Sequence, residues 1–232
     1  MMSSDRLETD AGAHVRVRRY SGAARLNHWV TAITFVALML SGLALFYPQY
    51  LYWLSALFGG GGTMRWLHPW LGVVLAVSFT GLFLRFAAAN LPERGDGKWL
   101  VSVRAVLSGN EEYLPEMGKY NPGQKVMFWG QSLLVVFLLL TGLVLWDQGR
   151  QFVETALGFQ FSIDAQRWAT LLHSAAAIAT IVLWVVHVYA GIWVRGTIGA
   201  MTSGSVSGGW AWRHHRKWLR QIVSTGETRR HG

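Results

Sequence analysis

Four histidines lie within stretches of sequence that are apolar enough to cross a lipid bilayer. They are His28, His68, His173 and His187. An ionisable side chain at membrane depth is costly, and these stretches contain no Asp or Glu, so the histidines indicate a functional site first and a packing role second. Neutral imidazole is a common metal ligand. We therefore expect these four residues to bind a metal-containing group.

Four apolar runs of about 20 residues or slightly more would position these histidines. The chain has 232 residues, of which 52% are hydrophobic. At about 1.5 Å per residue, a helix of this length crosses a hydrocarbon layer of roughly 30 Å. The sequence therefore predicts an all-α integral membrane four-helix bundle that forms a single domain over residues 1–232. The expected spans are residues 25–47, 66–88, 125–146 and 168–194.

The distribution of Lys and Arg predicts which segments face the cytoplasm. Eighteen of the 21 Lys and Arg residues lie in the N-terminal segment, the middle loop and the C-terminal segment. By the positive-inside rule, both termini and the middle loop are cytoplasmic, and the loops at 48–65 and 147–167 face outward. The net charge of +9 reflects this rule and attraction to anionic lipid, and nothing indicates nucleic-acid binding. The first run is too long for a cleaved signal peptide.

Depth determines how the histidines pair. His28 and His68 each begin a predicted span, but from opposite sides of the membrane, so they cannot share one metal. In the fourth span, His187 lies fourteen residues beyond His173, about 21 Å further along a helix and within about 40° of the same direction. We therefore expect His68 to pair with His173 in the outer leaflet and His28 to pair with His187 in the inner leaflet.

Two histidines at each depth favour haem over zinc. Zinc needs three or four side-chain ligands, whereas six-coordinate haem iron needs only two axial groups. The chain has no cysteine, which excludes its own iron–sulfur cluster and covalent haem attachment. A small residue, which would leave room for a porphyrin, follows one turn beyond each histidine: Ala32, Gly72, Ala177 and Gly191. A lone histidine could equally be a packing residue, but four at paired depths predict two haem b groups.

Short motifs surround these histidines. They are Arg25-Leu-Asn-His28-Trp, Leu67-His68-Pro-Trp-Leu-Gly72, the His173/His187 spacing, and Lys119-Tyr-Asn-Pro-Gly-Gln-Lys125. With these motifs the chain, over about residues 16–225, resembles the cytochrome b (gamma) subunit of membrane-bound respiratory formate dehydrogenase. The resemblance implies a dihaem cytochrome b of the bacterial cytoplasmic (inner) membrane. It would relay electrons from an outer iron–sulfur beta subunit through both haems to a quinone.

The resemblance also assigns partners and a quinone site. In that family a separate molybdenum- or tungsten-pterin alpha subunit oxidises formate, and this chain has no residues for that step. The equivalents of Asn121, Gly123 and Gln124 lie at a quinone pocket beside the inner haem, which implies menaquinone or ubiquinone as substrate. The segment also has turn chemistry, and by itself it would more often be a helix start with Asn121 as cap and Pro122 near the first helical position.

Other functions share parts of this pattern. The dihaem cytochrome b subunit of a membrane-bound nickel–iron hydrogenase has the same four-histidine arrangement. A haem-free transporter using histidines as proton relays, or a haemless membrane anchor, belongs to a different class, although such transporters usually carry intramembrane carboxylates. The sequence leaves open whether the heterotrimer forms a larger oligomer.

Several polar and basic residues have less specific roles. Arg65 and Arg167 precede the spans bearing His68 and His173, so they could pair with haem propionates or merely extend toward the membrane surface. Residues 98–107 and 210–219 are expected to form interfacial helices. The remaining histidines are expected to be solvated or lipid-facing: His14, His214, His215 and His231.

Overall fold

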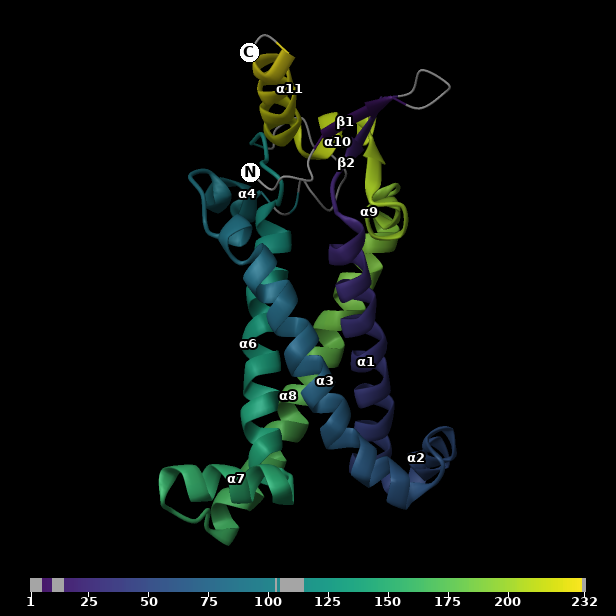
Figure 1. Cartoon of the computed structure of the whole chain (residues 1–232), viewed down its shortest axis with the longest axis vertical. Helices are drawn as coiled ribbons and strands as arrows, with labels where there is room; N and C mark the ends of the chain where they lie inside the picture. Colours follow the sequence, from purple (N-terminus) through teal and green to yellow (C-terminus); the bar gives the residue numbers. More distant parts are fainter. Residues whose placement is uncertain (1–5, 10–14, 103, 105–114, 231–232) are drawn as a thin grey trace. The chain divides into compact units, whose positions relative to one another are not determined.

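Four long helices dominate the computed structural model, which describes residues 6–9, 15–102, 104 and 115–230. Each is long and apolar enough to cross a membrane, and most of its side chains face outward, as contact with lipid requires. They are α1 (Gly22–Phe46), α3 (Gly61–Phe86), α6 (Pro122–Leu145) and α8 (Ile163–Trp193), drawn in Figure 1. The predicted all-α membrane bundle is confirmed, and each helix begins a few residues before its expected span.

Shorter elements connect the long helices. The connections between α1 and α3 and between α6 and α8 contain α2 (Pro48–Leu51), η1 (Tyr52–Phe58) and α7 (Asp147–Leu157). The middle loop contains η2 (Ala88–Asn90) and α4 (Asp96–Val101). The C-terminal segment contains α9 (Thr197–Thr202), α10 (Gly208–His214) and α11 (Arg216–Arg230). The interfacial helix expected over residues 98–107 is therefore described only in part, because residues 103 and 105–107 lie outside the described residues.

Local sequence explains where the long helices begin. The hydroxyl of Ser21 accepts a hydrogen bond from the backbone N–H of Ala24 at 3.3 Å at the start of α1. Ser162 does the same for Ala165 at 3.1 Å at the start of α8. A side-chain acceptor at this position satisfies one of the backbone donors that a helix leaves unpaired in its first turn. These serines therefore stabilise the entry points of the helices that carry His28 and His173.

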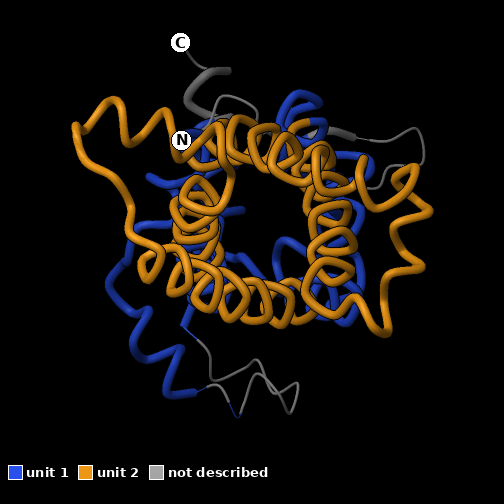
Figure 2. Tube along the Cα trace, turned by 90° about the horizontal axis from the view of Figure 1, so that it is seen from below, with its two compact units in different colours: residues 1–26, 84–129, 187–232 blue, residues 27–83, 130–186 orange. Residues whose placement is uncertain are grey.

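The chain forms two compact units, each built from separate stretches of sequence. Unit 2 contains residues 27–83 and 130–186, and unit 1 contains the described parts of residues 1–26, 84–129 and 187–232. Within unit 2 the four helical segments lie around a common axis (Figure 2). The outer connection of unit 2 packs Leu54 and Met64 against Ala44 of α1 in a buried apolar cluster. The single-domain organisation remains a prediction.

Unit 1 contains a small antiparallel sheet that the sequence analysis did not predict. Its strands are β1 (Arg6–Thr9), β2 (Val15–Arg18) and β3 (Ser205–Ser207), in the order β1-β2-β3. The register pairs Val17 with Val206, and both side chains are buried. The sheet therefore joins the N-terminal segment to the segment that follows α8.

A buried arginine organises the interior of unit 1. Arg19 is only 2% exposed, and its guanidinium carbon lies 5.5 Å from the ring centroid of Tyr120, 5.2 Å from that of Trp210 and 4.9 Å from that of Trp218. Its Nη2 also donates to the backbone carbonyl of Lys119. Aromatic faces attract a desolvated cation, so these rings compensate part of the cost of burying the charge.

The structure corrects two expectations about the C-terminal segment. His215, expected to be solvated or lipid-facing, is 1% exposed, and its Nδ1 lies 2.7 Å from the carbonyl oxygen of Gly118. Trp210 and Trp218 are buried as well, so residues 210–219 pack inside unit 1 instead of presenting all their tryptophans to a membrane surface. The physical reason is Arg19, a residue distant in sequence, which these rings surround. His14 and His231 lie outside the described residues.

Candidate haem and quinone sites

His68, on α3, makes a hydrogen bond with a hydroxyl on α1. Its Nδ1 lies 2.7 Å from Oγ of Ser41, and that Oγ is also 2.8 Å from the carbonyl oxygen of Ala37, one turn earlier on α1. Ligating histidines typically donate their second ring nitrogen to a nearby acceptor, which fixes the ring and directs the other nitrogen to the metal. His68 therefore has the surroundings of a ligand that would bind through Nε2.

His173, on α8, has the same surroundings. Its Nδ1 lies 2.8 Å from Oγ1 of Thr141 on α6, and that hydroxyl is 2.8 Å from the carbonyl oxygen of Phe137. That hydroxyl also lies 3.2 Å from the carbonyl oxygen of Leu138. The arrangement on α3 and α1 is thus repeated on α8 and α6, within the same unit.

A glycine follows each hydroxyl residue and lets the imidazole approach the neighbouring helix. A Cβ at Gly42 would lie 3.4 Å from Cε1 of His68, and a Cβ at Gly142 would lie 3.4 Å from Cε1 of His173. On α3, no described atom lies within 4 Å of the place where a Cβ of Gly72 would stand. Gly72, one turn beyond His68, therefore leaves open space on α3, as the sequence analysis expects beside a porphyrin.

The donor set fits haem better than a bare metal ion. Among the residues that the structure describes, no group of three or more His, Asp or Glu could hold a metal ion. His68 and His173 lie in the same compact unit, on different spanning helices. Two imidazoles from different helices are what a six-coordinate haem iron requires. The ligand pairing itself remains a prediction.

His28 and His187 belong to different units, so their pairing also remains a prediction. His28 lies on α1, half-buried, with its ring centroid 5.6 Å from that of Trp29 in an edge-to-face arrangement. His187 lies on α8 and is exposed. Fourteen residues separate it from His173 along that one continuous helix, as the sequence predicts.

Asn121 and Gln124 form reciprocal hydrogen bonds at the start of α6. The Oδ1 of Asn121 accepts from the backbone N–H of Gln124 at 2.9 Å, and the Oε1 of Gln124 accepts from the backbone N–H of Asn121 at 3.0 Å. This is a capping box, with Pro122 as the first residue of the helix. The prediction that this segment begins a helix, with Asn121 as its cap, is therefore confirmed. The side-chain NH2 groups are not the atoms used in these two bonds.

Gly123 lies close to the indole of Trp99 on α4. A Cβ at Gly123 would stand 3.0 Å from Cη2 of Trp99 and 3.4 Å from Oδ1 of Asn121. Any larger residue would force the indole or the cap to move. The sequence-predicted trio of Asn121, Gly123 and Gln124 therefore lies within one helical turn, against a buried tryptophan.

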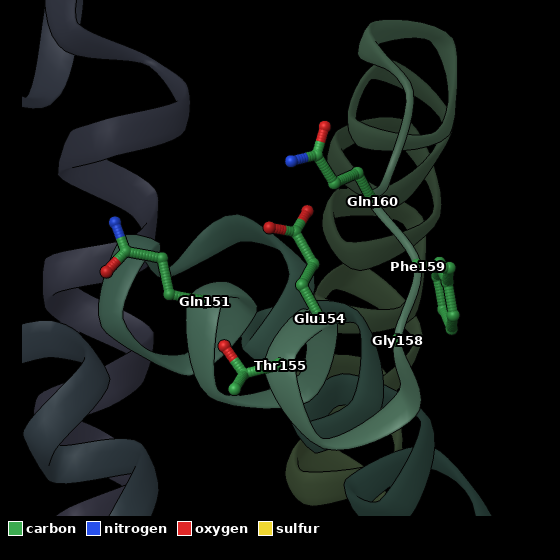
Figure 3. Close-up of a pocket in the computed structure, with 6 residues that line it drawn as sticks. All are labelled: Gln151, Glu154, Thr155, Gly158, Phe159 and Gln160. Carbon is green, nitrogen blue, oxygen red and sulfur yellow. The ribbon is translucent and has the colours of Figure 1, made fainter.

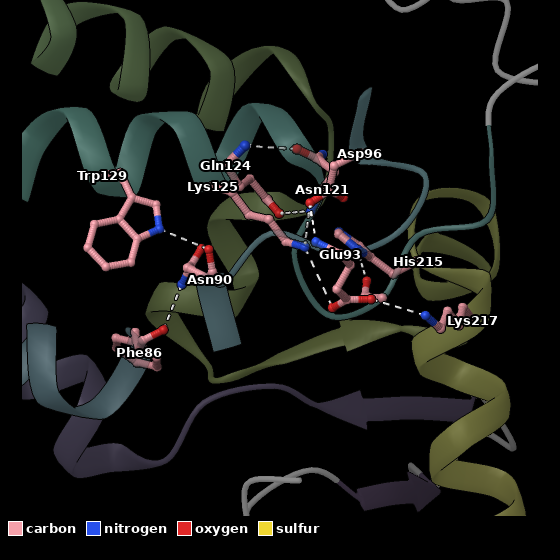
Figure 4. A network of polar contacts seen from close by, with 11 residues as sticks. Phe86, Asn90, Glu93, Asp96, Asn121, Gln124, Lys125, Trp129, His215 and Lys217 are labelled. Atoms are coloured by element: carbon pink, nitrogen blue, oxygen red, sulfur yellow. Dashed lines mark hydrogen bonds and ion pairs between the residues drawn. The ribbon is translucent and has the colours of Figure 1, made fainter. Parts of the chain in front are cut away.

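Ion pairs surround the first turn of α6 (Figure 4). Lys125 is 5% exposed, and its Nζ lies 3.0 Å from Oδ2 of Asp96 and 3.6 Å from Oε1 of Glu93. The other oxygen of Glu93 accepts from Lys217 of α11 at 3.0 Å, and this hydrogen bond lowers the pKa of Glu93. The buried lysine is thus neutralised by two carboxylates, which connect α6 to the middle loop and to α11.

The contacts of Arg65 and Arg167 favour neither of the two roles expected for them. Arg167 is exposed and pairs with Asp164, one turn earlier on α8, at 3.1 Å. Arg65 is exposed on α3. Exposed pairs of this kind have small net energies. Pairing of either arginine with a haem propionate remains a prediction.

Two cavities lie within unit 2, and neither is lined by a candidate ligand. An open hollow of about 530 Å³ lies beside α7 and the turn that follows it (Figure 3), lined by Gln151, Glu154, Thr155, Gly158, Phe159 and Gln160. A second, of about 450 Å³, lies between α1 and α3 and is largely apolar, with Asn27 and Ser78 as its polar lining residues. Asn27 directly precedes His28 in the sequence.

The sequence analysis missed Ser41, Gly42, Thr141 and Gly142. A sequence signal for them exists, because Leu-Ser-Gly-Leu at 40–43 recurs as Leu-Thr-Gly-Leu at 140–143. Hydroxyl residues in membrane helices commonly bond to their own backbone, so each motif by itself predicts only local packing. Only the structure brings the hydroxyl groups to the histidines.

Comparison with known proteins gives the chain a family. The family model described as prokaryotic cytochrome b561 matches residues 19–204. The chain is 41% identical over 209 residues to the formate dehydrogenase cytochrome b556(fdo) subunit of Escherichia coli (strain K12), covering 90% of this chain and 94% of that one. It is 38% identical over 208 residues to the formate dehydrogenase cytochrome b556 subunit of Haemophilus influenzae, covering 90% and 84%.

A more distant relative comes from the class of the alternative function. The chain is 26% identical over 198 residues to a probable Ni/Fe-hydrogenase B-type cytochrome subunit of Bradyrhizobium diazoefficiens, covering 75% of this chain and 76% of that one. The family match includes all four spanning helices and all four intramembrane histidines. This chain belongs to the prokaryotic cytochrome b561 family.

Proposed function

We propose that this chain is the dihaem membrane subunit of a respiratory formate dehydrogenase, relaying electrons from a partner subunit outside the cytoplasm to a quinone near the cytoplasmic side. Membership of the family already implies a multi-pass membrane cytochrome that binds haem b and transfers electrons. The printed names of the relatives at 38% to 41% identity support the assignment to a formate dehydrogenase complex. Two haems, the ligand pairs and the quinone are the further content of the proposal.

The observation that carries the proposal is the repeated hydroxyl–imidazole contact in unit 2. His68 and His173 each use Nδ1 for a hydroxyl of a neighbouring helix, which leaves Nε2 as the nitrogen for a metal. The two residues come from different spanning helices. We therefore assign them as the axial ligands of the outer haem.

The assignment of the inner haem depends on where its two ligands lie along their spanning helices. His28 begins the first spanning helix and His187 lies near the inner end of the fourth, so both belong to the cytoplasmic half of the membrane if the positive-inside rule holds. We assign this pair as the ligands of the inner haem, and Gly191, one turn beyond His187, as the small residue beside it.

The chain would supply the axial ligands of both haems and the apolar helices that surround them. When bound, haem iron accepts and releases single electrons, and two axial imidazoles leave it no open coordination site for oxygen chemistry. The four apolar helices exclude water, while α8 contributes one ligand to each haem over a rise of about 21 Å. α8 would therefore hold both haems on one rigid element, and the proposed direction of electron transfer is from the outer side toward the cytoplasm.

Quinone reduction is assigned to the start of α6. The capping box uses the side-chain oxygens of Asn121 and Gln124, so their amide N–H groups are the atoms that would donate to the carbonyl oxygens of a quinone. Gly123 keeps the backbone of this turn accessible beside Trp99. Menaquinone and ubiquinone share the carbonyl groups that this chemistry recognises, and either fits the proposal.

The partners follow from what the chain lacks and from the relatives. The chain contains no cysteine, so the iron–sulfur clusters that feed the outer haem belong to a beta subunit. A molybdenum- or tungsten-pterin alpha subunit oxidises formate. We place the complex in the bacterial cytoplasmic (inner) membrane, because Lys and Arg are concentrated on one side of the predicted spans.

Haem content of the purified complex tests the ligand assignments. We expect two haem b per chain, with His68→Ala removing the outer haem and His187→Ala removing the inner haem. His187→Ala should abolish quinone reduction by formate while the outer haem is still reduced. Reduced-minus-oxidised visible spectra and a pyridine haemochrome assay measure both. A His187→Ala complex that keeps two haems contradicts the assignment, and reduction of the wild-type complex by hydrogen but not by formate favours the hydrogenase alternative.

A further inference from the structure

We infer that Ser41 and Thr141 are positioning residues that hold His68 and His173 in the tautomer protonated on Nδ1, so that each Nε2 carries the lone pair needed for metal binding. The inference rests on the proposed haem ligation by these histidines. It adds two side chains whose effect would pass through the imidazole ligands that they contact.

The direction of each hydrogen bond follows from counting protons. A hydroxyl has one proton to donate and two lone pairs to accept with. The carbonyls of Ala37 and Leu38 lie 2.8 Å and 3.2 Å from Oγ of Ser41 and can only accept, so the hydroxyl proton points to them. The remaining contact, at 2.7 Å to Nδ1 of His68, then requires the imidazole to be the donor. Nε2 of His68 is therefore the unprotonated nitrogen.

The same count applies to the second site. Oγ1 of Thr141 lies 2.8 Å from the carbonyl oxygen of Phe137, which takes its proton, and 2.8 Å from Nδ1 of His173. The carbonyl of Leu138, 3.2 Å from the same Oγ1, can also only accept, so the contact with Nδ1 is again the one in which the imidazole donates. The pair α1 and α3 and the pair α6 and α8 thus show the same hydroxyl–imidazole contact.

Packing prevents the rings from turning away. Ser41 is fully buried and Thr141 nearly so. The glycines that follow them bring each ring edge within van der Waals distance of the neighbouring helix, at 3.4 Å from the position of a Cβ. In an apolar interior, an imidazole N–H that loses its acceptor has no water to replace it. The hydroxyl groups therefore control both the protonation pattern and the orientation of the rings.

The consequence is a predicted change in outer-haem potential and retention. An acceptor for Nδ1–H makes the imidazole a stronger donor through Nε2 and favours ferric iron. Ser41→Ala should therefore raise the midpoint potential of the outer haem. Loss of an outer-shell partner typically weakens binding about 10- to 100-fold. If the substitution weakens binding of the ferric haem about tenfold more than binding of the ferrous haem, the midpoint potential rises by about 59 mV.

Redox titration of the purified complex, followed at the haem b α-band, tests this. Ser41→Ala should raise the outer-haem potential, and Ser41→Thr, which keeps the hydroxyl, should restore it. Ser78→Ala is the matched control, because Ser78 also bonds to its own helix, at 3.2 Å to the carbonyl of Leu75. For the second site, Thr141→Val is compared with Thr180→Val, because Thr180 is buried and bonds to Ala176 at 2.6 Å.

The outcomes separate this inference from the proposed function. If His68→Ala removes the outer haem but Ser41→Ala and Thr141→Val behave like their controls, the positioning role is wrong and the ligand assignment stands. A lowered potential in Ser41→Ala would also overturn the inference, because it would mean that the hydroxyl donates to the ring. The inner-haem signal in each variant reports whether the chain is folded. If His68→Ala retains both haems, the proposed function itself fails.

Discussion

At the scale of single residues, the arginine and histidine inside unit 1 have the largest electrostatic consequence. Arg19 is a permanent charge enclosed by aromatic rings, and Arg rather than Lys suits such a site because its planar group stacks on rings while still donating hydrogen bonds. His215 lies among the same rings, 5.0 Å from Trp210 by ring centroid. Burial, and then the charge of Arg19, lower the pKa of His215 well below 6.5. The folded protein therefore holds His215 neutral.

This predicts that unit 1 is destabilised by acid. Below pH 6.5 the unfolded chain binds a proton at His215 that the folded chain does not, so the free energy of opening falls as the pH is lowered from 6.5. Hydrogen exchange of the backbone amides of α10 and α11 in the purified complex measures this. His215→Asn keeps a donor for the carbonyl of Gly118 without a titrating group, and should flatten the dependence between pH 6.5 and pH 5. An unchanged slope in His215→Asn would assign the pH effect to another group.

Much at this scale could not be predicted from the sequence. The intramembrane histidines are visible because an ionisable residue in an apolar run is rare. By contrast, His215 stands in a basic, Trp-containing stretch that is typical of a membrane surface, and its buried surroundings include Arg19 and the carbonyl of Gly118, which are distant in the chain. Ser41 and Thr141 were missed because hydroxyls in membrane helices usually bond within their own helix, and theirs do so as well.

At the scale of elements, helix length and helix ends were predictable, while the short strands were not. Apolar runs of about 20 residues predict spanning helices, and Asn-Pro-Gly-Gln predicts a helix start. The strands have only three or four residues, with arginines alternating in β2. An alternation that short competes poorly with other interpretations. β1 and β2 pair with each other directly, whereas β3, which also pairs with β2, follows it only after all four spanning helices.

The start of α6 combines capping with the proposed quinone site, and substitutions can separate the two. Asn121→Asp and Gln124→Glu keep the acceptor oxygens of the capping box but remove the amide N–H donors. We expect them to lower quinone reduction by formate at least tenfold while leaving haem content and thermal stability near wild type. Asn121→Ala removes the cap as well and should cost about 1 kcal/mol of stability. Steady-state quinone reduction and thermal unfolding of the complex measure these effects.

The control lies in the same network. Lys217→Met removes the partner of Glu93 on α11 without touching the turn, so quinone reduction should stay near wild type. Equal losses of activity in Asn121→Asp and Lys217→Met would indicate that the whole cytoplasmic network matters and that these amide groups have no special role.

At the scale of the whole molecule, the basic residues are concentrated on the side of the membrane toward which the proposed electron transfer runs. Eighteen of the 21 Lys and Arg residues fall in the three stretches that make up unit 1. The positive-inside rule then assigns those stretches to the cytoplasm. Under the proposed function, electrons move inward toward this side. Moving two electrons against a membrane potential of about 100 mV costs roughly 4 to 5 kcal/mol. Part of the free energy of formate oxidation would therefore be stored as membrane potential.

Sealed vesicles containing the complex test this direction. With the outer side facing the medium and a quinone in the membrane, addition of formate should generate a potential that is negative inside, detected with a voltage-sensitive dye. An ionophore should collapse the potential and accelerate formate oxidation. The His187→Ala complex, assembled in the same way, should generate none. Rapid formate oxidation by the wild-type complex without any potential would place both half-reactions on one side of the membrane.

The cage around Arg19 also bears on how the protein is made. The ribosome releases Arg19 with the first residues of the chain, whereas Trp210 and Trp218 emerge only after the last membrane helix. Until then the guanidinium lacks two of the rings that enclose it in the finished protein. The cage can therefore close only after the last membrane helix has been synthesised, and a product truncated before α10 would leave Arg19 without these two rings.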